Sequence, residues 1–327
     1  MKISVLGSGG WGTALAILSA KCSHETILWG KFKEEIETIK ENRENPLLKG
    51  VEIPESIEIT DDINAIIGSD MFIIATPSFA VEETAEMLGS YVKNDAIIIS
   101  VAKGFEKKTL RRFSEVIKEK LPCNPVVVLS GPSHAEEVGR KIPTSIVAAS
   151  EDEASAIAVQ EALSNKFFRI YTNIDVIGVE TGGALKNVIA VAAGIIRGMK
   201  LGDNTLAALI TRGLNEMSLL GEALGGEKNT FAGLSGIGDL VVTCTSEHSR
   251  NHSFGKLIGK GISTDEARKV VGTVEGYYAT ETAKRLADEY GVEMPIVNEC
   301  YKILYEGMDV RLAIKNLMTR DKKKENF

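Results

Sequence analysis

The first half of the chain alternates short apolar runs with longer amphipathic segments. The runs are rich in Ile and Val, are bounded by Gly, Pro or Ser, and predict buried strands at residues 3–6, 27–29, 71–75, 96–100 and 126–130. The segments between them have helical spacing and predict helices at 13–20, 33–41, 81–88 and 108–120. Two further strands, at 145–149 and 168–171, are expected to flank a helix at 153–163. This alternation predicts a doubly wound, mostly parallel sheet with helices on both faces.

From about residue 175 onward, strand-like runs nearly vanish and long helical patterns replace them. Gly and Asn separate these patterns, which predict helices at 176–197, 205–224, 250–259, 277–290, 295–306 and 310–318. We therefore expect two domains, an α/β domain at 1–175 and an all-helical domain at 176–327.

The composition is that of a globular protein and argues against several other classes. The chain has 327 residues, of which 44% are hydrophobic and 25% charged, so disordered and fibrous classes are excluded. A net charge of −7 gives no overall basic footprint for nucleic acid. The scattered cysteines and histidines predict neither a metal site nor a disulfide framework. With no signal-peptide pattern and no long uncharged apolar stretch, we expect a cytoplasmic protein without membrane insertion.

Gly7, Gly9 and Gly12 form a GxGxxG pattern between the first predicted strand and the first predicted helix. In a dinucleotide-binding turn the first glycine permits the tight turn, the second lets the pyrophosphate approach, and the third lets the helix pack on the strand. The N–H groups of the helix start then bind phosphate. The alternative is a plain glycine turn. Trp11, inside the turn, either covers the cofactor or anchors the turn in the core.

The end of the second predicted strand bears on the choice between NAD and NADP. An acid at this position would bind the ribose 2′-hydroxyl of NAD. This chain has Lys31 and Lys33 instead, and a cation favours a 2′-phosphate, so NADP(H) is expected at least to be accepted. The alternatives are a solvated helix start, or a ribose contact from Glu34 or Glu35.

Three charges stand alone in otherwise uncharged stretches, where burying a charge is costly. Lys103 follows the strand at 96–100, at the sheet edge where open α/β folds bind ligands; otherwise it is a loop lysine that reaches solvent. Lys186 lies in a small, apolar helix, and burial makes a lysine easier to deprotonate, which suits proton transfer; otherwise it is structural. Asp239 is expected to pair with Lys186 or to bind a substrate hydroxyl; the alternative is that it caps a helix.

The helix around Lys186 also contains Gly182 and Gly183, which are expected to leave room for a flat ring. Two further segments have the chemistry of anion sites. One opens the predicted helix at 250–259 with residues suited to phosphate: Ser249, Arg250 and Asn251. The other follows the strand at 126–130 and contains Gly131 and Ser133. The alternatives are an ordinary capped surface helix and a strand-to-helix turn in which Ser133 is the N-cap.

Together these motifs resemble the bacterial-type NAD(P)-dependent glycerol-3-phosphate dehydrogenase family over nearly the whole chain. The resemblance is carried by the stretches at 7–16, 101–104, 130–135, 183–187, 203–204, 208–213, 233–239 and 249–251. It implies a Rossmann domain followed by a helical domain of the 6-phosphogluconate dehydrogenase C-terminal type. It also implies a homodimer that reversibly reduces dihydroxyacetone phosphate to sn-glycerol 3-phosphate with NAD(P)H, supplying glycerophospholipid synthesis.

The resemblance also assigns residues to ligands. In addition to the glycines of the turn, the residues implied to contact NADP(H) or NAD(H) are Gly10, Trp11, Lys31, Lys103, Ala135, Arg250 and Glu275. Those implied to contact the substrate are Lys103, Gly131, Ser133, Lys186, Asp239, Ser249, Arg250 and Asn251. Lys186 is the implied proton donor and acceptor, and Lys103 and Asp239 are further catalytic residues. The chain departs from the family pattern at Gly10 (usually Ser), at Arg197 and Lys200 (a stretch often acidic or Gly-rich) and at His252 (often Arg).

Two other functions stay open at this stage. One is another β-hydroxyacid or ketopantoate-type reductase on the same two-domain plan, which would prefer a carboxylate substrate. The other is a catalytically silent NADP-binding sensor. A sensor would need the glycine turn but not Lys186, Asp239 and Arg250 together.

Overall fold

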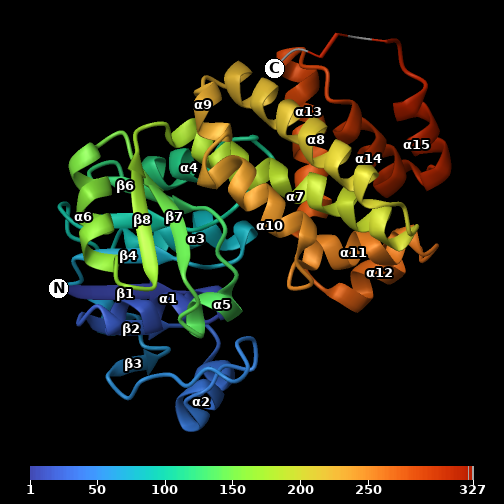
Figure 1. Ribbon diagram of the computed structural model, residues 1–327. Helices are drawn as coiled ribbons and strands as arrows, with labels where there is room; N and C mark the ends of the chain where they lie inside the picture. Colours follow the sequence, from blue (N-terminus) through green and yellow to red (C-terminus); the bar gives the residue numbers. More distant parts are fainter. Residues whose placement is uncertain (323, 326–327) are drawn as a thin grey trace. The chain divides into compact units, whose positions relative to one another are not determined.

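The computed structural model describes residues 1–322 and 324–325. The chain forms two compact units, Met1–Val176 (unit 1) and Ile177–Phe327 (unit 2). Unit 1 contains an eight-stranded sheet with helices, and the described residues of unit 2 contain helices but no strand (Figure 1).

The sheet of unit 1 has the strand order of a doubly wound nucleotide-binding fold. Its strands are β1 (Lys2–Leu6), β2 (Glu25–Trp29), β3 (Ile57–Thr60), β4 (Met71–Ile74), β5 (Ile97–Ser100), β6 (Val126–Ser130), β7 (Thr144–Ala149) and β8 (Phe168–Asn173). Their order is β3-β2-β1-β4-β5-β6-β7-β8, and only β6 and β7 pair antiparallel. The first six strands thus follow the order 3-2-1-4-5-6 typical of dinucleotide binding. The predicted mostly parallel sheet is confirmed, while β3 was not predicted.

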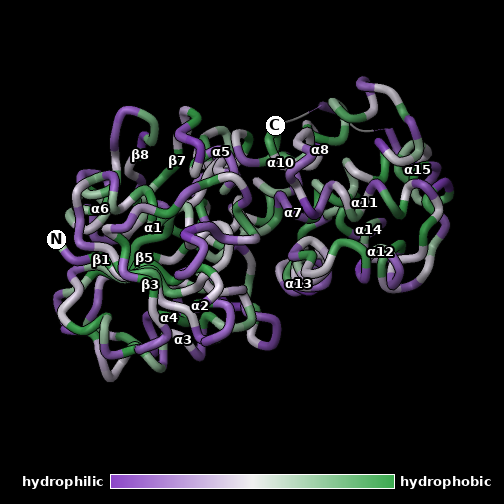
Figure 2. Tube along the Cα trace, turned by 90° about the horizontal axis from the view of Figure 1, so that it is seen from below, coloured by the Kyte–Doolittle hydropathy of each residue, from purple (hydrophilic) through white to green (hydrophobic). Residues whose placement is uncertain are grey.

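Helices cover both faces of the sheet, so its strands are largely buried on both sides, except for the edge strands β3 and β8, which alternate between buried and exposed residues. The helices of unit 1 are α1 (Gly10–Lys21), α2 (Lys33–Asn42), α3 (Val81–Leu88), α4 (Phe113–Lys120), α5 (Ala135–Gly139) and α6 (Glu153–Leu163), with 3-10 turns at Ile63–Ile66 and Ser78–Ala80. Ile73 packs in one core cluster with α1 and α6, and its neighbours Phe72 and Ile74 pack in another with α3 and α4. Figure 2 shows hydrophobic segments through the interior of unit 1 around β1 and β5.

The helix predicted at 108–120 begins later than expected, at Phe113. Residues 105–112 form a turn instead, closed by a bridge between Phe105 and Arg112. The carboxylate of Glu106 accepts hydrogen bonds from the backbone N–H groups of Lys108 and Thr109, which holds this turn. Local side-chain bonds of this kind compete with helix formation.

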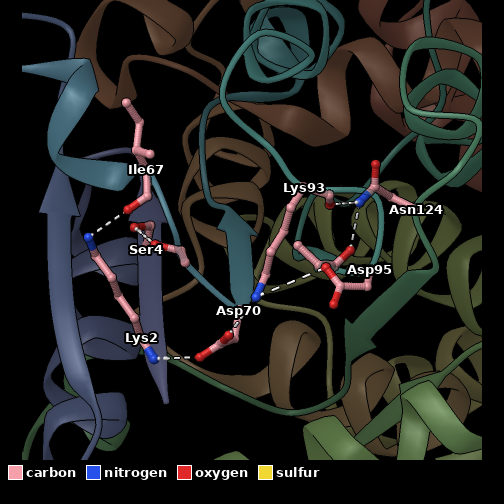
Figure 3. Close-up of polar contacts among 9 residues, drawn as sticks. Lys2, Ser4, Ile67, Asp70, Lys93, Asp95 and Asn124 are labelled. Carbon is pink, nitrogen blue, oxygen red and sulfur yellow. Dashed lines mark hydrogen bonds and ion pairs between the residues drawn. The ribbon is translucent and has the colours of Figure 1, made fainter.

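A polar network joins the amino ends of the parallel strands β1, β4, β5 and β6, opposite the edge where such sheets bind ligands (Figure 3). The carboxylate of Asp70 accepts hydrogen bonds from the backbone N–H of Lys2 and from Nζ of Lys93, both at 2.9 Å. The side-chain amide of Asn124 donates to the carbonyl oxygens of Lys93 and Ala96. The bond from Lys93, followed by that from the backbone of Lys2, lowers the pKa of Asp70.

This network predicts how stability depends on pH. Because the pKa of Asp70 is lower in the folded state, its stabilisation is present above the unfolded value of about 3.9 and is lost as pH falls through the folded value. We expect Asp70→Asn to lower Tm at pH 7, and the difference from the unmodified protein to shrink toward pH 3. Thermal melts across this range measure it. Asp95→Asn is the control, because Asp95 lies 4.0 Å from Lys93 and is largely exposed. A difference that does not change with pH would contradict the assignment.

Unit 2 is built around one long buried helix. Its helices are α7 (Val176–Gly198), α8 (Asp203–Ala223), α9 (Lys228–Phe231), the π-helical turn η3 (Leu234–Gly238), α10 (Asp239–Thr245), α11 (Arg250–Gly259), α12 (Thr264–Val271), α13 (Glu275–Tyr290), α14 (Pro295–Glu306) and α15 (Val310–Met318). The short elements α9, η3, α10 and α12 were not predicted. By length and composition α7 could cross a membrane, but its most apolar window is completely buried, as expected of a core helix.

Glycines let α7 and α11 pack backbone against backbone. Gly194 and Gly198 on α7 face Gly255 and Gly259 on α11, each pair four residues apart. A Cβ at Gly194 would lie 2.1 Å from a carbonyl oxygen of α11, and one at Gly255 would lie 2.0 Å from a carbonyl oxygen of α7. No larger side chain fits at this spacing, so these glycines let the middle and end of α11 pack against the C-terminal part of α7.

Candidate functional site

The glycine turn at the start of α1 has the shape that a pyrophosphate requires. Gly7 has φ +119°, and a Cβ there would lie 2.6 Å from the carbonyl oxygen of Ala75. A Cβ at Gly12 would lie 2.0 Å from the carbonyl oxygen of Gly7, whereas one at Gly9 would meet nothing within 4 Å. Gly9 is the N-cap of α1 and supplies no side-chain cap. The first N–H groups of α1 therefore need acceptors beside an open space, which fits a dinucleotide.

Asn45, which sequence analysis did not single out, stabilises this turn by hydrogen bonds. Its side-chain amide is buried and donates to the carbonyl oxygen of Ser8 and to Oγ1 of Thr13, both at 2.7 Å. Its own oxygen accepts from the backbone N–H of Leu47 at 2.9 Å. A Cβ at Gly10 would lie 2.6 Å from the carbonyl oxygen of Leu47, which explains why this chain has glycine there. Asn45 lies in an irregular loop without periodicity, so no pattern marked it.

The lysines at the tip of β2 are both engaged in exposed ion pairs. Nζ of Lys31 lies 2.6 Å from Glu83 at the start of α3, and Lys33 lies 3.7 Å from Glu37, one turn along α2. The pair with Glu83 keeps the charge of Lys31 at the end of β2. Exposed pairs of this kind are worth only about 0–1 kcal/mol, so an incoming phosphate can compete for Lys31.

Two other residues of this region have defined positions. Glu35 reaches back to the glycine turn, where its carboxylate accepts a hydrogen bond of 3.3 Å from Oγ of Ser8. Trp11 is half-buried and packs against the core of unit 1. Unit 1 therefore has both a cation, Lys31, and an acid, Glu35, close to the end of β2, the region that bears on ribose recognition in dinucleotide-binding folds.

Lys103, Gly131 and Ser133 come together at the carboxyl edge of β5 and β6. The carbonyl oxygen of Gly131 accepts hydrogen bonds from Nζ of Lys103 at 3.3 Å and from Oγ of Ser133 at 3.0 Å. Gly131 has φ +142°, and a Cβ there would lie 3.0 Å from the backbone of Ile146. Ser133 is not the N-cap of α5; that position belongs to His134, whose side chain makes no capping bond. The cluster presents one half-buried ammonium group at the edge where ligands bind.

Lys186 forms the centre of a buried polar cluster in unit 2. Only 5% of Lys186 and 1% of Asp239 are exposed, and the two side chains form an ion pair. Nζ of Lys186 also donates to Oγ1 of Thr243 at 2.9 Å, and this hydroxyl donates to the backbone oxygen of Asp239. Asp239 is not a helix cap: Gly238 is the N-cap of α10, and Asp239 is its first residue. The carboxylate therefore orients an ammonium group that can donate a proton.

Thr243 was missed by sequence analysis, although it lies one helical turn after Asp239 in the same apolar stretch. The space expected beside Gly182 is also filled: a Cβ at Gly182 would lie 2.6 Å from the carbonyl oxygen of Ser235 in η3. The prediction that Gly182 leaves room for a flat ring is therefore wrong. Burial raises the pKa of Cys244, the next residue, to about 12, so its thiol is not a nucleophile near neutral pH.

The start of α11 is fixed by a second set of bonds. Ser249 is the N-cap, and its hydroxyl accepts from the backbone N–H of His252 at 3.2 Å. The side chain of Asn251 donates to Asn187, the residue after Lys186, and accepts from the backbone N–H of Gly276, both at 2.8 Å. These hydrogen bonds of Asn251 within unit 2 were not predicted. It ties α11 to α7 and α13.

Arg250 is the first residue of α11 and is exposed, and the first turn of this helix contains no acid. An arginine beside a helix N-terminus suits a phosphate group. Of the other predicted contact residues, Ala135 opens α5 and Glu275 opens α13. Among the described residues no group of His, Cys, Asp and Glu could hold a metal ion.

Comparison with known proteins places both units in one family. Residues 2–156 match the family profile described as "NAD-dependent glycerol-3-phosphate dehydrogenase N-terminus", and residues 175–315 match the corresponding C-terminus profile. The chain belongs to the NAD-dependent glycerol-3-phosphate dehydrogenase family. This confirms the predicted family, fold class and nicotinamide cofactor.

Individual members of this family are similar over the whole chain. Glycerol-3-phosphate dehydrogenase [NAD(P)+] of Thermoanaerobacter sp. (strain X514) is 52% identical over 327 residues, covering 99% of both chains. That of Desulfitobacterium hafniense (strain Y51) is 47% identical, covering 99% of this chain and 93% of the relative. The crystal structure of the Coxiella burnetii glycerol-3-phosphate dehydrogenase has a TM-score of 0.93 and 37% identity, covering 98% of this chain and 99% of the other.

More distant structures share the fold alone. A ketopantoate reductase from Ralstonia eutropha JMP134 has a TM-score of 0.64 and 14% identity, covering 97% of this chain and all of the other. The two-domain plan is therefore common to reductases with different substrates. Within the glycerol-3-phosphate dehydrogenase family, function has to be argued from the site residues rather than from the plan.

Proposed function

We propose that this protein reduces dihydroxyacetone phosphate to sn-glycerol 3-phosphate, reversibly, with NADPH or NADH, and so supplies glycerophospholipid synthesis. The observation that carries the proposal is the buried Lys186–Asp239 pair with Thr243, in a unit whose α11 begins with Ser249 and Arg250. Reduction of a ketone phosphate needs a proton donor and a phosphate site, and these residues have that chemistry. The family membership of the chain supports the same reaction.

The glycine turn is the proposed holder of the cofactor. Gly7, Gly9, Gly10 and Gly12 would let the N–H groups at the start of α1 bind the pyrophosphate. When bound, the dihydronicotinamide supplies the hydride that reduces C2 of the substrate. Further proposed cofactor contacts are Trp11, Lys31, Lys103, Ala135, Arg250 and Glu275.

Each catalytic residue has a separate proposed role. Lys186 donates a proton to the alkoxide that develops at C2, and takes it back in the reverse reaction. Asp239 orients Lys186 through their ion pair, and Thr243 fixes the direction of its Nζ. Lys103 orients the substrate together with Gly131 and Ser133. Ser249, Arg250 and Asn251 hold the phosphate group, which places C2 for attack.

Initial rates of NADPH and NADH oxidation at 340 nm with dihydroxyacetone phosphate test the proposal. Turnover is expected with at least one cofactor, and the ratio of the rates shows whether Lys31 or Glu35 determines the preference. A folded protein that binds NADPH but turns over ketoacids and not ketose phosphates would favour the ketopantoate-type alternative. Binding without turnover of any ketone would indicate a sensor.

The phosphate assignment predicts a specific kinetic effect. Arg250→Ala is expected to raise KM for dihydroxyacetone phosphate at least tenfold, because an Arg–phosphate contact is a charge-assisted bond worth about 1.5–3 kcal/mol. Arg285→Ala, on α13, is the matched control. Steady-state kinetics at saturating NADPH measures the effect. An unchanged KM would remove Arg250 from the phosphate site.

We also propose, from the family resemblance, that the enzyme is a cytoplasmic homodimer. Light scattering on the purified protein tests the dimer, and cell fractionation tests the location. A fully active monomer would contradict the proposed homodimer.

A further inference from the structure

Unit 1 contains a pocket of about 350 Å³ that the proposed reaction does not use. It is lined by the second half of α1, by α5 and the segment that follows it, and by the segment between α6 and β8 together with the first residue of β8. Its volume lies at the small end of the range of about 300–1,000 Å³ typical of ligand sites. Ile17 and Lys21 line it, about 10 and 16 Å along α1 from Gly10 at a rise of 1.5 Å per residue. The pocket is thus at the opposite end of α1 from the glycine turn.

The pocket combines an apolar wall with a cationic rim. The wall consists mainly of Ile17, Leu18, Val138, Ile142, Phe167 and Phe168. The rim carries Lys21, Lys141 and Lys166, and no acidic residue lines the pocket. All three lysines are exposed, and in the described part of the chain none of them forms an ion pair. Lys166 lies against an apolar neighbour instead, with Nζ 5.1 Å from the ring centre of Phe167.

The positive charge of the rim is uncompensated. Although Lys21 is exposed, partial desolvation lowers its pKa, and the charge of Lys141 lowers it further. Lys141 is also held in the left-handed region, with φ +62°, where its N–H closes the end of α5 by donating to Val138 at 3.0 Å. Glycine is favoured at such a position, so the lysine here costs stability rather than adding to it. An anion between the lysines would relieve their mutual repulsion.

We propose that this pocket is a second binding site, for a small amphiphile that carries a carboxylate or phosphate group on an apolar chain. The anionic group binds between Lys21, Lys141 and Lys166, and the chain lies against Ile17, Leu18 and Ile142. Both parts are needed: the anion alone meets only exposed lysines, which bind weakly. Each methylene buried against the wall tightens binding about fourfold until the pocket is full.

Titration calorimetry of the full chain with octanoate and with octyl phosphate, both below their micelle concentrations, tests the proposal. Each is expected to bind at least tenfold more tightly than inorganic phosphate or octanol, which offer only one of the two parts. The tighter of the two identifies the head group as a fatty carboxylate or a lipid-type phosphate. Saturating NADPH is not expected to displace either probe. These measurements do not depend on catalytic activity, so they can fail while the proposed function holds.

Substitutions locate the binding in this pocket. The double variant Lys21→Gln, Lys141→Gly is expected to weaken binding about tenfold, since each exposed charge contributes up to about a factor of five. Glycine keeps the backbone of position 141, so the variant is expected to fold. Lys40→Gln, which removes an exposed charge on α2, is the control. Equal binding by the double variant, no binding of either probe, displacement by NADPH, or binding to phosphatidylglycerol vesicles in place of the monomeric probes would each overturn the proposal.

Discussion

Lys186→Ala is expected to lower kcat about 100-fold or more while NADPH binding stays intact. A positioned proton donor typically contributes about 10²–10⁴ in rate. Lys186 has the position for this role because it is buried in α7 and directed by the carboxylate of Asp239 and the hydroxyl of Thr243. Water has little access to replace it, since only 5% of the residue is exposed. Stopped-flow or steady-state rates, together with a fluorescence titration of NADPH, measure the two quantities separately.

Lys228→Ala is the matched control for this prediction, because Lys228 is an exposed lysine in the same unit, on α9. Its kcat is expected to stay within about twofold of the unmodified protein. Thr243→Val gives a graded test: the hydroxyl orients Nζ without carrying the proton, so a smaller loss of kcat and a changed pH profile are expected. If Lys186→Ala retains its activity, the proton comes from another group and the proposed mechanism is wrong.

Sequence patterns predicted the fold well where local signals and tertiary structure agree. The inner strands of unit 1 are mostly apolar runs because both sheet faces are covered, and α7 is apolar nearly all round because it is the core of unit 2. β3 was not predicted because only Ile57 and Ile59 are buried within it, so it has no continuous apolar run. The delayed start of α4 and the π turn before α10 depend on side-chain and backbone contacts that periodicity does not contain.

The same distinction holds for the candidate site. Lys103, Lys186 and Asp239 were singled out because a lone charge in an apolar stretch is costly unless it has a partner or a function. The pairing of Asp239 with Lys186 was among the predicted roles of Asp239. The supporting residues were not predictable in this way: Asn45 is one polar residue in an irregular loop, and Thr243 is a small residue in a helix. Position 10 requires glycine because the backbone at Leu47, which is distant in sequence, approaches it closely. Positioning residues are therefore revealed by the structure rather than by the pattern.

Asp239→Leu is expected to destabilise the protein by about 3–5 kcal/mol, because it leaves the ammonium group of Lys186 buried without its counter-charge. Urea unfolding followed by fluorescence and circular dichroism measures the loss. Asp288→Ala is the control: it breaks the more exposed pair with Lys284 on α13, and a change of no more than about 1 kcal/mol is expected.

The double variant Lys186→Met, Asp239→Leu separates stability from catalysis. Replacing both members of a buried pair by apolar residues of similar size is often neutral or stabilising. We therefore expect the double variant to recover most of the stability that Asp239→Leu loses, yet to have no more activity than Lys186→Ala. A double variant as unstable as the single one would mean that Asp239 stabilises the fold through contacts other than Lys186. Recovery of stability without activity would show that the ion pair is kept for the reaction and not for the fold.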